Sequence, residues 1–203
     1  MASNPRILSN LKVNLIAAAD SKMGIGRNGD LPWRLPNEFR HFVQKTRQTQ
    51  DPDKKNVVIL GRKCWDSIPP NFRPLSDRIN IILSRTMAQP SQEEQKRDPV
   101  YVCKSMEDAF QLVSSPKLSE IVEGVWNVGG CDIYRLGLES PSFHRLYLTK
   151  VDGDFGCDVF FPQVDWSQFK RVYLDDVPQG IQEEENKKTG QMVKYEYFVY
   201  ERV

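Results

Sequence analysis

The chain has 203 residues, with 28 Lys and Arg against 27 Asp and Glu, so its formal net charge is +1 at pH 7. With 39% hydrophobic and 27% charged residues, its composition excludes a disordered or collagen-like chain, and no apolar run reaches the roughly 20 residues of a membrane-spanning helix. A chain of this length buries roughly 70% of its unfolded surface, so we expect one domain, residues 1–203, that needs no disulfide or metal to fold.

Charge and the supply of metal ligands exclude further classes of protein. A nucleic-acid clamp requires a strongly basic face, so strong nucleic-acid binding is not expected of this near-neutral chain. The four cysteines form no CxxC pair and the chain has two histidines, so the sequence predicts no metal site. The first residues, MASNPRILSNLK, hold no continuous apolar segment typical of a secretion signal. We therefore expect a cytoplasmic protein with reduced thiols and no membrane partner.

Strand-like and helix-like patterns alternate through the first two thirds of the chain. Near-continuous apolar runs are typical of strands buried on both faces, and apolar residues at i, i+3 and i+4 are typical of amphipathic helices. In chain order the predicted elements are strand 13–19, helix 37–46, strand 56–60, helix 62–68, strand 78–83, strand 100–103, helix 105–113, strand 125–128 and helix 132–138. This alternation predicts a layered α/β fold.

The last third of the chain changes character. Segments 145–151, 169–174 and 195–201 have alternating or aromatic-rich strand patterns with no long helix between them, so they should pair antiparallel. The polar segments 87–98 and 175–191 are expected to be loops. The predicted architecture is therefore a three-layer, doubly wound mixed sheet of about eight strands, mostly parallel with an antiparallel C-terminal strand, and four main helices.

Two glycine-rich segments follow predicted strands, at the sheet edge where open α/β folds bind ligands. Segment 23–33, MGIGRNGDLPW, indicates a loop that can move and that ends in a rigid aromatic anchor, although an ordinary surface connection has a similar composition. Gly129 and Gly130 precede the predicted helix 132–138 and would let the backbone approach a pyrophosphate, although such pairs are also common in simple turns.

Basic residues follow three successive predicted strands. Gly61 is followed by Arg62 and Lys63 at the start of a short helix, where unpaired backbone N–H groups and a partial positive charge favour phosphate. Arg85 and Lys104 follow the next two strands. Each cation alone could be a solvated surface charge, but their shared position at strand ends favours a dinucleotide that carries an extra phosphate.

The motifs taken together resemble those of the eukaryotic dihydrofolate reductases, from about residue 13 to residue 202. They are, in order, IAAA, MGIGRNGDLPW, NEFRHF, VVILGRKCWDSIP, RPLSDRINIILSR, WNVGGCDIY, YLTKV and CDVFFP. The resemblance implies that fold and an NADPH-dependent reduction of 7,8-dihydrofolate to 5,6,7,8-tetrahydrofolate, with hydride added at C6 and a proton at N5, in support of one-carbon metabolism and thymidylate synthesis. It also implies a monomer without a metal, whose small-molecule partners are dihydrofolate and antifolate inhibitors.

The same resemblance assigns the substrate side. It implies that Glu38 binds the 2-aminopyrimidinone edge of the substrate and handles its proton, with Thr149, Trp33 and Leu31 completing the catalytic set. One carboxylate can accept both N–H donors of that edge, and a partly desolvated acid should have a raised pKa. Arg78 would bind the α-carboxylate of the glutamyl tail. The remaining implied substrate residues are Ile16, Ala17, Phe39, Phe42, Ser67, Ile68, Leu75, Val128 and Tyr134.

On the cofactor side the resemblance implies NADPH. The implied contacts are Ala18, Ile25, Gly26, Gly29, Asp30, Gly61, Arg62, Lys63, Cys64, Ser84, Arg85, Lys104, Gly129, Gly130, Cys131, Asp132 and Ile133. Two of the departures from the family pattern concern this region. Cys64 stands where the family commonly has Thr, and Asn127 is polar where an apolar residue usually precedes Val-Gly-Gly.

Two other functions share parts of this pattern. A pyrimidine or pterin reductase on the same fold, such as those of riboflavin synthesis, would not be expected to keep both Glu38 and Arg78. A catalytically silent module that binds NADPH or RNA would not need Trp33, Glu38 and Thr149 together. Loss of NADPH absorbance with dihydrofolate separates these alternatives.

Overall fold

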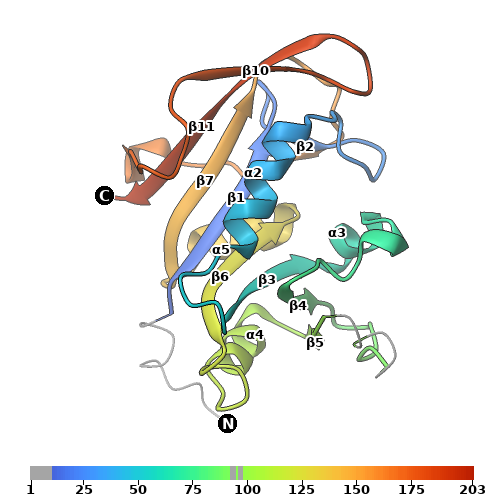
Figure 1. Cartoon of the computed structure of the whole chain (residues 1–203), viewed down its shortest axis with the longest axis vertical. Helices are drawn as coiled ribbons and strands as arrows, with labels where there is room; N and C mark the ends of the chain where they lie inside the picture. The colour runs from blue at the N-terminus through green and yellow to red at the C-terminus, as the bar shows by residue number, and fades with distance from the viewer. Residues whose placement is uncertain (1–10, 92–94, 96–97) are drawn as a thin grey trace.

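The computed structural model describes residues 11–91, 95 and 98–203, and one large sheet forms its centre (Figure 1). The strand order is β10-β11-β7-β1-β6-β3-β4-β5, and β9 also pairs with β11. The strands are β1 Val13–Ala19, β2 Gly24–Gly26, β3 Lys55–Gly61, β4 Arg78–Leu83, β5 Val100–Cys103, β6 Val122–Gly129, β7 Phe143–Val151, β8 Val159–Phe160, β9 Phe169–Val172, β10 Ile181–Glu185 and β11 Met192–Arg202. The helices are α2 Pro36–Arg47, α3 Arg62–Ser67, α4 Met106–Val113 and α5 Cys131–Glu139, with short 3-10 turns at Pro70–Phe72 and Trp166–Gln168.

The direction of the strands follows from their connections. From β5 across to β7 all neighbours pair parallel, and between β1 and β3, β3 and β4, β5 and β6, and β6 and β7 the chain forms a helix. By contrast, β11 pairs antiparallel with β7, and β9 and β10 pair antiparallel with β11. These features confirm the predicted mixed sheet, with its antiparallel C-terminal edge and four helices.

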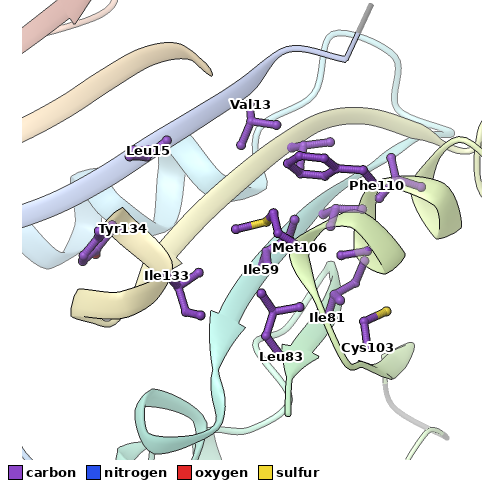
Figure 2. Packing of buried hydrophobic residues seen from close by; sticks show 14 of the residues in the cluster. Val13, Leu15, Ile59, Ile81, Leu83, Cys103, Met106, Phe110, Ile133 and Tyr134 are labelled. Carbon is purple, nitrogen blue, oxygen red and sulfur yellow. The ribbon is translucent and has the colours of Figure 1, made fainter. Parts of the chain in front are cut away.

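Two cores lie on opposite faces of the sheet because side chains alternate along each strand. In β3, Val57 and Ile59 belong to the core shown in Figure 2, where Phe110 of α4 and Ile133 of α5 also pack. Val58 and Leu60 of the same strand belong to the other core. Trp65 of α3 and the half-buried Phe42 of α2 pack in that second core, so each face is covered by its own pair of helices.

Most predicted boundaries agree with the structure to within a few residues, but one predicted loop is wrong. Segment 175–191 contains β10, which the polar sequence IQEEE does not suggest. As an edge strand, β10 pairs with β11 alone, and charged side chains are common on such strands. The short antiparallel pair of β2 with β8 was also not predicted. Part of 87–98 and the first ten residues lie outside the described residues. No helix in the described part of the chain is long and apolar enough to cross a membrane.

Candidate active site

The N-terminal turn of α2 carries a buried acid. Glu38 is 7% exposed, and Thr149 of the adjacent β7 donates its hydroxyl to Glu38 Oε1 at 2.9 Å. Burial raises the pKa of Glu38 to about 7, and the negative charge of Glu184 adds to this, while the hydrogen bond from Thr149 opposes it. The structure therefore brings Glu38 and Thr149 together, and the acid can exchange a proton near neutral pH.

Trp33 and Leu31, also expected in the catalytic set, lie in the segment that enters α2. Trp33 is buried, and its ring meets Phe155 edge-on at a centroid distance of 5.1 Å. Leu31 is instead 47% exposed. The buried Trp33 ring therefore fixes the end of the 23–33 segment, whereas the Leu31 side chain is available to a ligand.

Arg78, at the start of β4, is the buried cation of the site. It is 3% exposed, and its guanidinium donates to the Ser76 carbonyl at 3.0 Å and to Thr46 Oγ1, in the last turn of α2, at 2.7 Å. Burial lowers the pKa of Arg78 to about 10, so the group still carries its charge at neutral pH. No described carboxylate forms a salt bridge with it. A buried cation bonded to neutral oxygens favours an anionic ligand group.

Apolar side chains lie along α2 between these two ionisable groups. Phe39 stacks on Phe42 with ring centroids 5.7 Å apart, and Phe39 is 48% exposed. The other predicted apolar substrate residues in the same core as Phe42 are Ile16 of β1, Ile68 after α3, Leu75 before β4 and Val128 of β6. The side chain of Ala17 belongs to the opposite core, and that of Ser67 is exposed, with its hydroxyl donating to the Cys64 carbonyl at 2.7 Å.

The predicted cations lie at one edge of the sheet. Since β3, β4 and β5 are neighbouring parallel strands, Arg62, Lys63, Arg85 and Lys104 follow carboxyl ends that lie side by side. Arg62 pairs with Asp66 at 3.3 Å, whereas Lys63, Arg85 and Lys104 form no salt bridge with any other described residue. All four are exposed. Their charge is therefore available to an anion.

Two helices begin beside this edge. Gly61 is the N-cap of α3 and Gly130 the N-cap of α5. A Cβ on Gly61 would lie 3.0 Å from Ile133 and 3.9 Å from the Gly129 carbonyl, so the two helix starts lie next to each other. Gly129 has φ +99°, and a Cβ there would lie 2.5 Å from the Tyr134 ring, so only glycine fits. The arrangement presents backbone N–H groups from two helices to one place.

Asn127 explains how the glycine turn is held. It is fully buried, its Nδ2 donates to the Ile133 carbonyl at 2.6 Å, and its Oδ1 accepts the Gly129 N–H at 3.1 Å. The amide thus links the end of β6 to the first turn of α5. The polar side chain at this position is a structural connection between a strand and a helix.

The segment after β1 folds back on itself through a buried acid. Asp20 accepts the N–H groups of Lys22 at 2.9 Å, Gly24 at 2.8 Å and Phe155 at 3.2 Å. These bonds lower the pKa of Asp20 against the effect of burial. The predicted cofactor residues placed by this segment are Ala18 in β1, Ile25 and Gly26 in β2, and Gly29 and Asp30 in the loop after it. Ser84 lies after β4, and Cys131, Asp132 and Ile133 form the first turn of α5.

Comparison with known proteins decides the family. Residues 12–202 match the family model described as Dihydrofolate reductase. The chain is 40% identical over 192 residues to the dihydrofolate reductase of Bos taurus, covering 94% of this chain and 97% of that protein. The chain belongs to the dihydrofolate reductase family. This confirms the family that the motifs indicated, and it makes the chain an oxidoreductase.

Two further comparisons agree. The chain is 41% identical over 191 residues to the dihydrofolate reductase of Mus musculus, covering 94% of this chain and 97% of that protein. The solved dihydrofolate reductase of Schistosoma mansoni matches with a TM-score of 0.78 and 33% identity, covering 95% of this chain and 99% of that one. The fold of the dihydrofolate reductases therefore extends over almost the whole chain.

Three features of this dihydrofolate reductase fold were not predicted from the sequence. The Tyr134 hydroxyl donates to the Ile16 carbonyl at 2.8 Å, so that oxygen already has one partner within the protein. Burial raises the pKa of Cys64 to about 11, which keeps it a neutral thiol. Glu184 of β10 faces α2, and no motif marks it within the run of three Glu residues.

Proposed function

We propose that the chain reduces 7,8-dihydrofolate to 5,6,7,8-tetrahydrofolate with NADPH, by direct hydride transfer to C6 and protonation at N5. Membership of the family supports the reduction itself. The observation that carries the substrate assignment is that Glu38 and Arg78 lie near opposite ends of α2. Arg78 contacts Thr46, which is two turns or about 12 Å along the axis from Glu38, with Phe39 and Phe42 between them.

This spacing suits a ligand with a polar ring at one end and a carboxylate at the other. The Glu38 carboxylate would accept both N–H donors of the 2-amino edge, and the exposed Phe39 and Leu31 would cover the flat rings between. The fork of Arg78 would bind the α-carboxylate of the tail.

The proton step belongs to Glu38 in this proposal. With a pKa of about 7, the acid is part protonated at neutral pH and can pass a proton through water towards N5. Thr149 holds one oxygen of the carboxyl group, so the other is free to face the ligand. The buried ring of Trp33 closes the neighbouring side against solvent.

The residues at the cofactor edge fit a dinucleotide. A Cβ on Gly130, the N-cap of α5, would meet nothing within 4 Å, and this open space lets the backbone approach a pyrophosphate beside the starts of α3 and α5. Lys63, Arg85 and Lys104, which lack described salt-bridge partners, would meet a 2′-phosphate, which favours NADPH over NADH. When bound, the nicotinamide supplies the hydride.

We also propose that residues 1–203 act as a single domain and a monomer that binds dihydrofolate and antifolates. The test of the function is a spectrophotometric assay of the purified chain with NADPH and dihydrofolate. We expect NADPH absorbance to fall with dihydrofolate present and to fall much more slowly with NADH. No loss of absorbance beyond that of a Glu38→Gln control would contradict the proposal.

A further inference from the structure

The N-terminus of α2 is held by a residue from another part of the chain. Its N-cap, Leu35, offers no side-chain bond. Instead, the carboxylate of Glu184 in β10 accepts the N–H of Asn37 at 3.1 and 2.9 Å and the N–H of Glu38 at 3.0 Å. A carboxylate at a helix N-terminus satisfies unpaired donors and interacts favourably with the helix dipole. The position of Glu38 therefore depends directly on Glu184.

The surroundings of Glu184 are built to keep a carboxylate there. Glu184 is 8% exposed, and no described Lys, Arg or His forms a salt bridge with it. Burial, with a contribution from the charge of Glu184, raises the pKa values of Tyr195 and Tyr197, so both phenols are neutral at pH 7. Within the described residues, the Glu184 carboxylate makes three hydrogen-bond contacts to two backbone N–H groups and no salt bridge.

The turn that follows β10 reinforces the same attachment. Asn186 Oδ1 accepts the Arg34 N–H at 3.0 Å, and the N–H of Lys187 donates to the Arg34 carbonyl at 2.9 Å. Lys188 forms a salt bridge with Asp30 at 2.7 Å. Three successive positions of the turn therefore hold the chain just before α2.

We propose that Glu184 is a positioning residue for Glu38: its carboxylate fixes the first turn of α2 and places a negative charge beside the Glu38 carboxyl, so that Glu38 retains its proton for the reaction. The proposal rests on the proposed function, in which Glu38 handles the proton. Glu184 itself has no role in contacting substrate.

The other described groups around Glu38 do not raise its pKa through a negative charge. Thr149 of β7 donates a hydrogen bond, which acts in the opposite direction by favouring the ionised form. Burial raises the pKa values of Tyr134 on α5 and of Tyr195 and Tyr197 on β11, so these three phenols are neutral at pH 7.

On α2 itself, burial lowers the pKa of His41 to about 4, with Lys45 adding to the effect, so the imidazole is neutral at pH 7 as well. Lys45 is paired with Asp176 at 2.5 Å. Besides burial, the charge of Glu184 is therefore the influence that raises the pKa of Glu38.

The test compares Glu184→Gln with Glu183→Gln. Glu183 lies on the same strand but is exposed, so the matched variant removes the same charge from β10 without touching α2. The pH dependence of hydride transfer is measured in single turnovers, and the carboxyl carbon of Glu38 is titrated by carbon-13 NMR in the full-length protein, with Glu38→Gln as the assignment standard.

We expect Glu184→Gln to move both midpoints to lower pH by about half a unit, with Glu183→Gln equal to wild type. Glu184→Asp keeps the charge but places it further from α2, so its midpoints should fall between those of wild type and those of Glu184→Gln. A cap with no electrostatic role would lower thermal stability in both Glu184 variants without moving the midpoints.

Equal midpoints in wild type, Glu184→Gln and Glu184→Asp would overturn the proposal, as would an equal shift in Glu183→Gln. If Glu184→Gln does not fold, the order of wild type and Glu184→Asp decides the same question. The NMR titration needs no substrate, so failure of the proposed reaction and failure of the role of Glu184 give different results.

Discussion

The proposed substrate side and the proposed cofactor side of the site differ in how they are built. In the proposed function, substrate recognition depends on two buried ionisable side chains, Glu38 of α2 and Arg78 of β4, with pKa values of about 7 and about 10. Cofactor recognition at the ends of β3 to β5 would instead depend on backbone N–H groups, glycines and exposed cations. The difference implies that single side chains decide function on the first side, whereas backbone shape decides it on the second. Four substitutions test this contrast.

The largest effect is expected from Glu38→Gln. At neutral pH it removes the proton donor and should lower turnover by about 10² to 10⁴-fold, while NADPH binding, followed by Trp fluorescence, stays unchanged. In wild type, turnover should fall as pH rises through about 7, because Glu38 then loses its proton. The variant should lose that transition. Unimpaired turnover would remove Glu38 from the mechanism.

Gly129→Ala comes next and tests the backbone side. A Cβ there meets the Tyr134 ring at 2.5 Å at φ +99°, so we expect a loss of about 2 to 5 kcal/mol in the free energy of unfolding. The control is Gly130→Ala, where nothing lies within 4 Å. Urea denaturation measures both. Equal losses in the two variants would show that the close contact between position 129 and the Tyr134 ring does not cause the loss of stability.

Arg78→Leu should weaken folate binding by about 2 to 4 kcal/mol, which is roughly 30- to 1000-fold. Thr46 keeps a partner in this variant because its hydroxyl also donates to the Phe42 carbonyl at 2.8 Å. Binding is measured with dihydrofolate and with its analogue that lacks the glutamate. If removing the glutamate weakens wild type and variant equally, Arg78 does not bind the tail.

The smallest effect is expected from Cys64→Thr, on the cofactor side. Backbone N–H groups should dominate binding there, so NADPH affinity should change less than about tenfold, or ~1.4 kcal/mol. Fluorescence titration with NADPH gives the value. A hundredfold change would mean that side chains decide recognition on this side too.

The sequence predicted the parts of the fold that local apolar patterns determine. The buried runs of β1, β4 and β5 were placed at their observed bounds, because a strand buried on both faces has few polar positions. The strand β10 was missed because an edge strand can be polar on most positions, and β2 because three residues with two glycines carry no strand pattern.

The site residues also divide into those that local motifs predict and those that depend on long-range contacts. Motifs pointed to Glu38, Thr149 and Arg78, and the structure places the first two in contact. The connection between Glu184 and α2 spans 146 residues in sequence and depends on strand pairing that the local sequence does not encode. The partner of the Ile16 carbonyl, Tyr134, lies 118 residues away and was equally beyond local patterns.

The amide of Asn127 has a consequence for how the sequence can change. A Cβ on Gly137 of α5 would lie 2.4 Å from Asn127 Nδ2, so the amide occupies the space that an alanine would need. Glycine inside a helix is about 1 kcal/mol less favourable than alanine, yet here it is the residue that admits the amide. Substitutions at positions 127 and 137 are therefore coupled. An alanine at position 137, which would favour the helix, can be accepted only after Asn127 has been replaced by a residue without the amide.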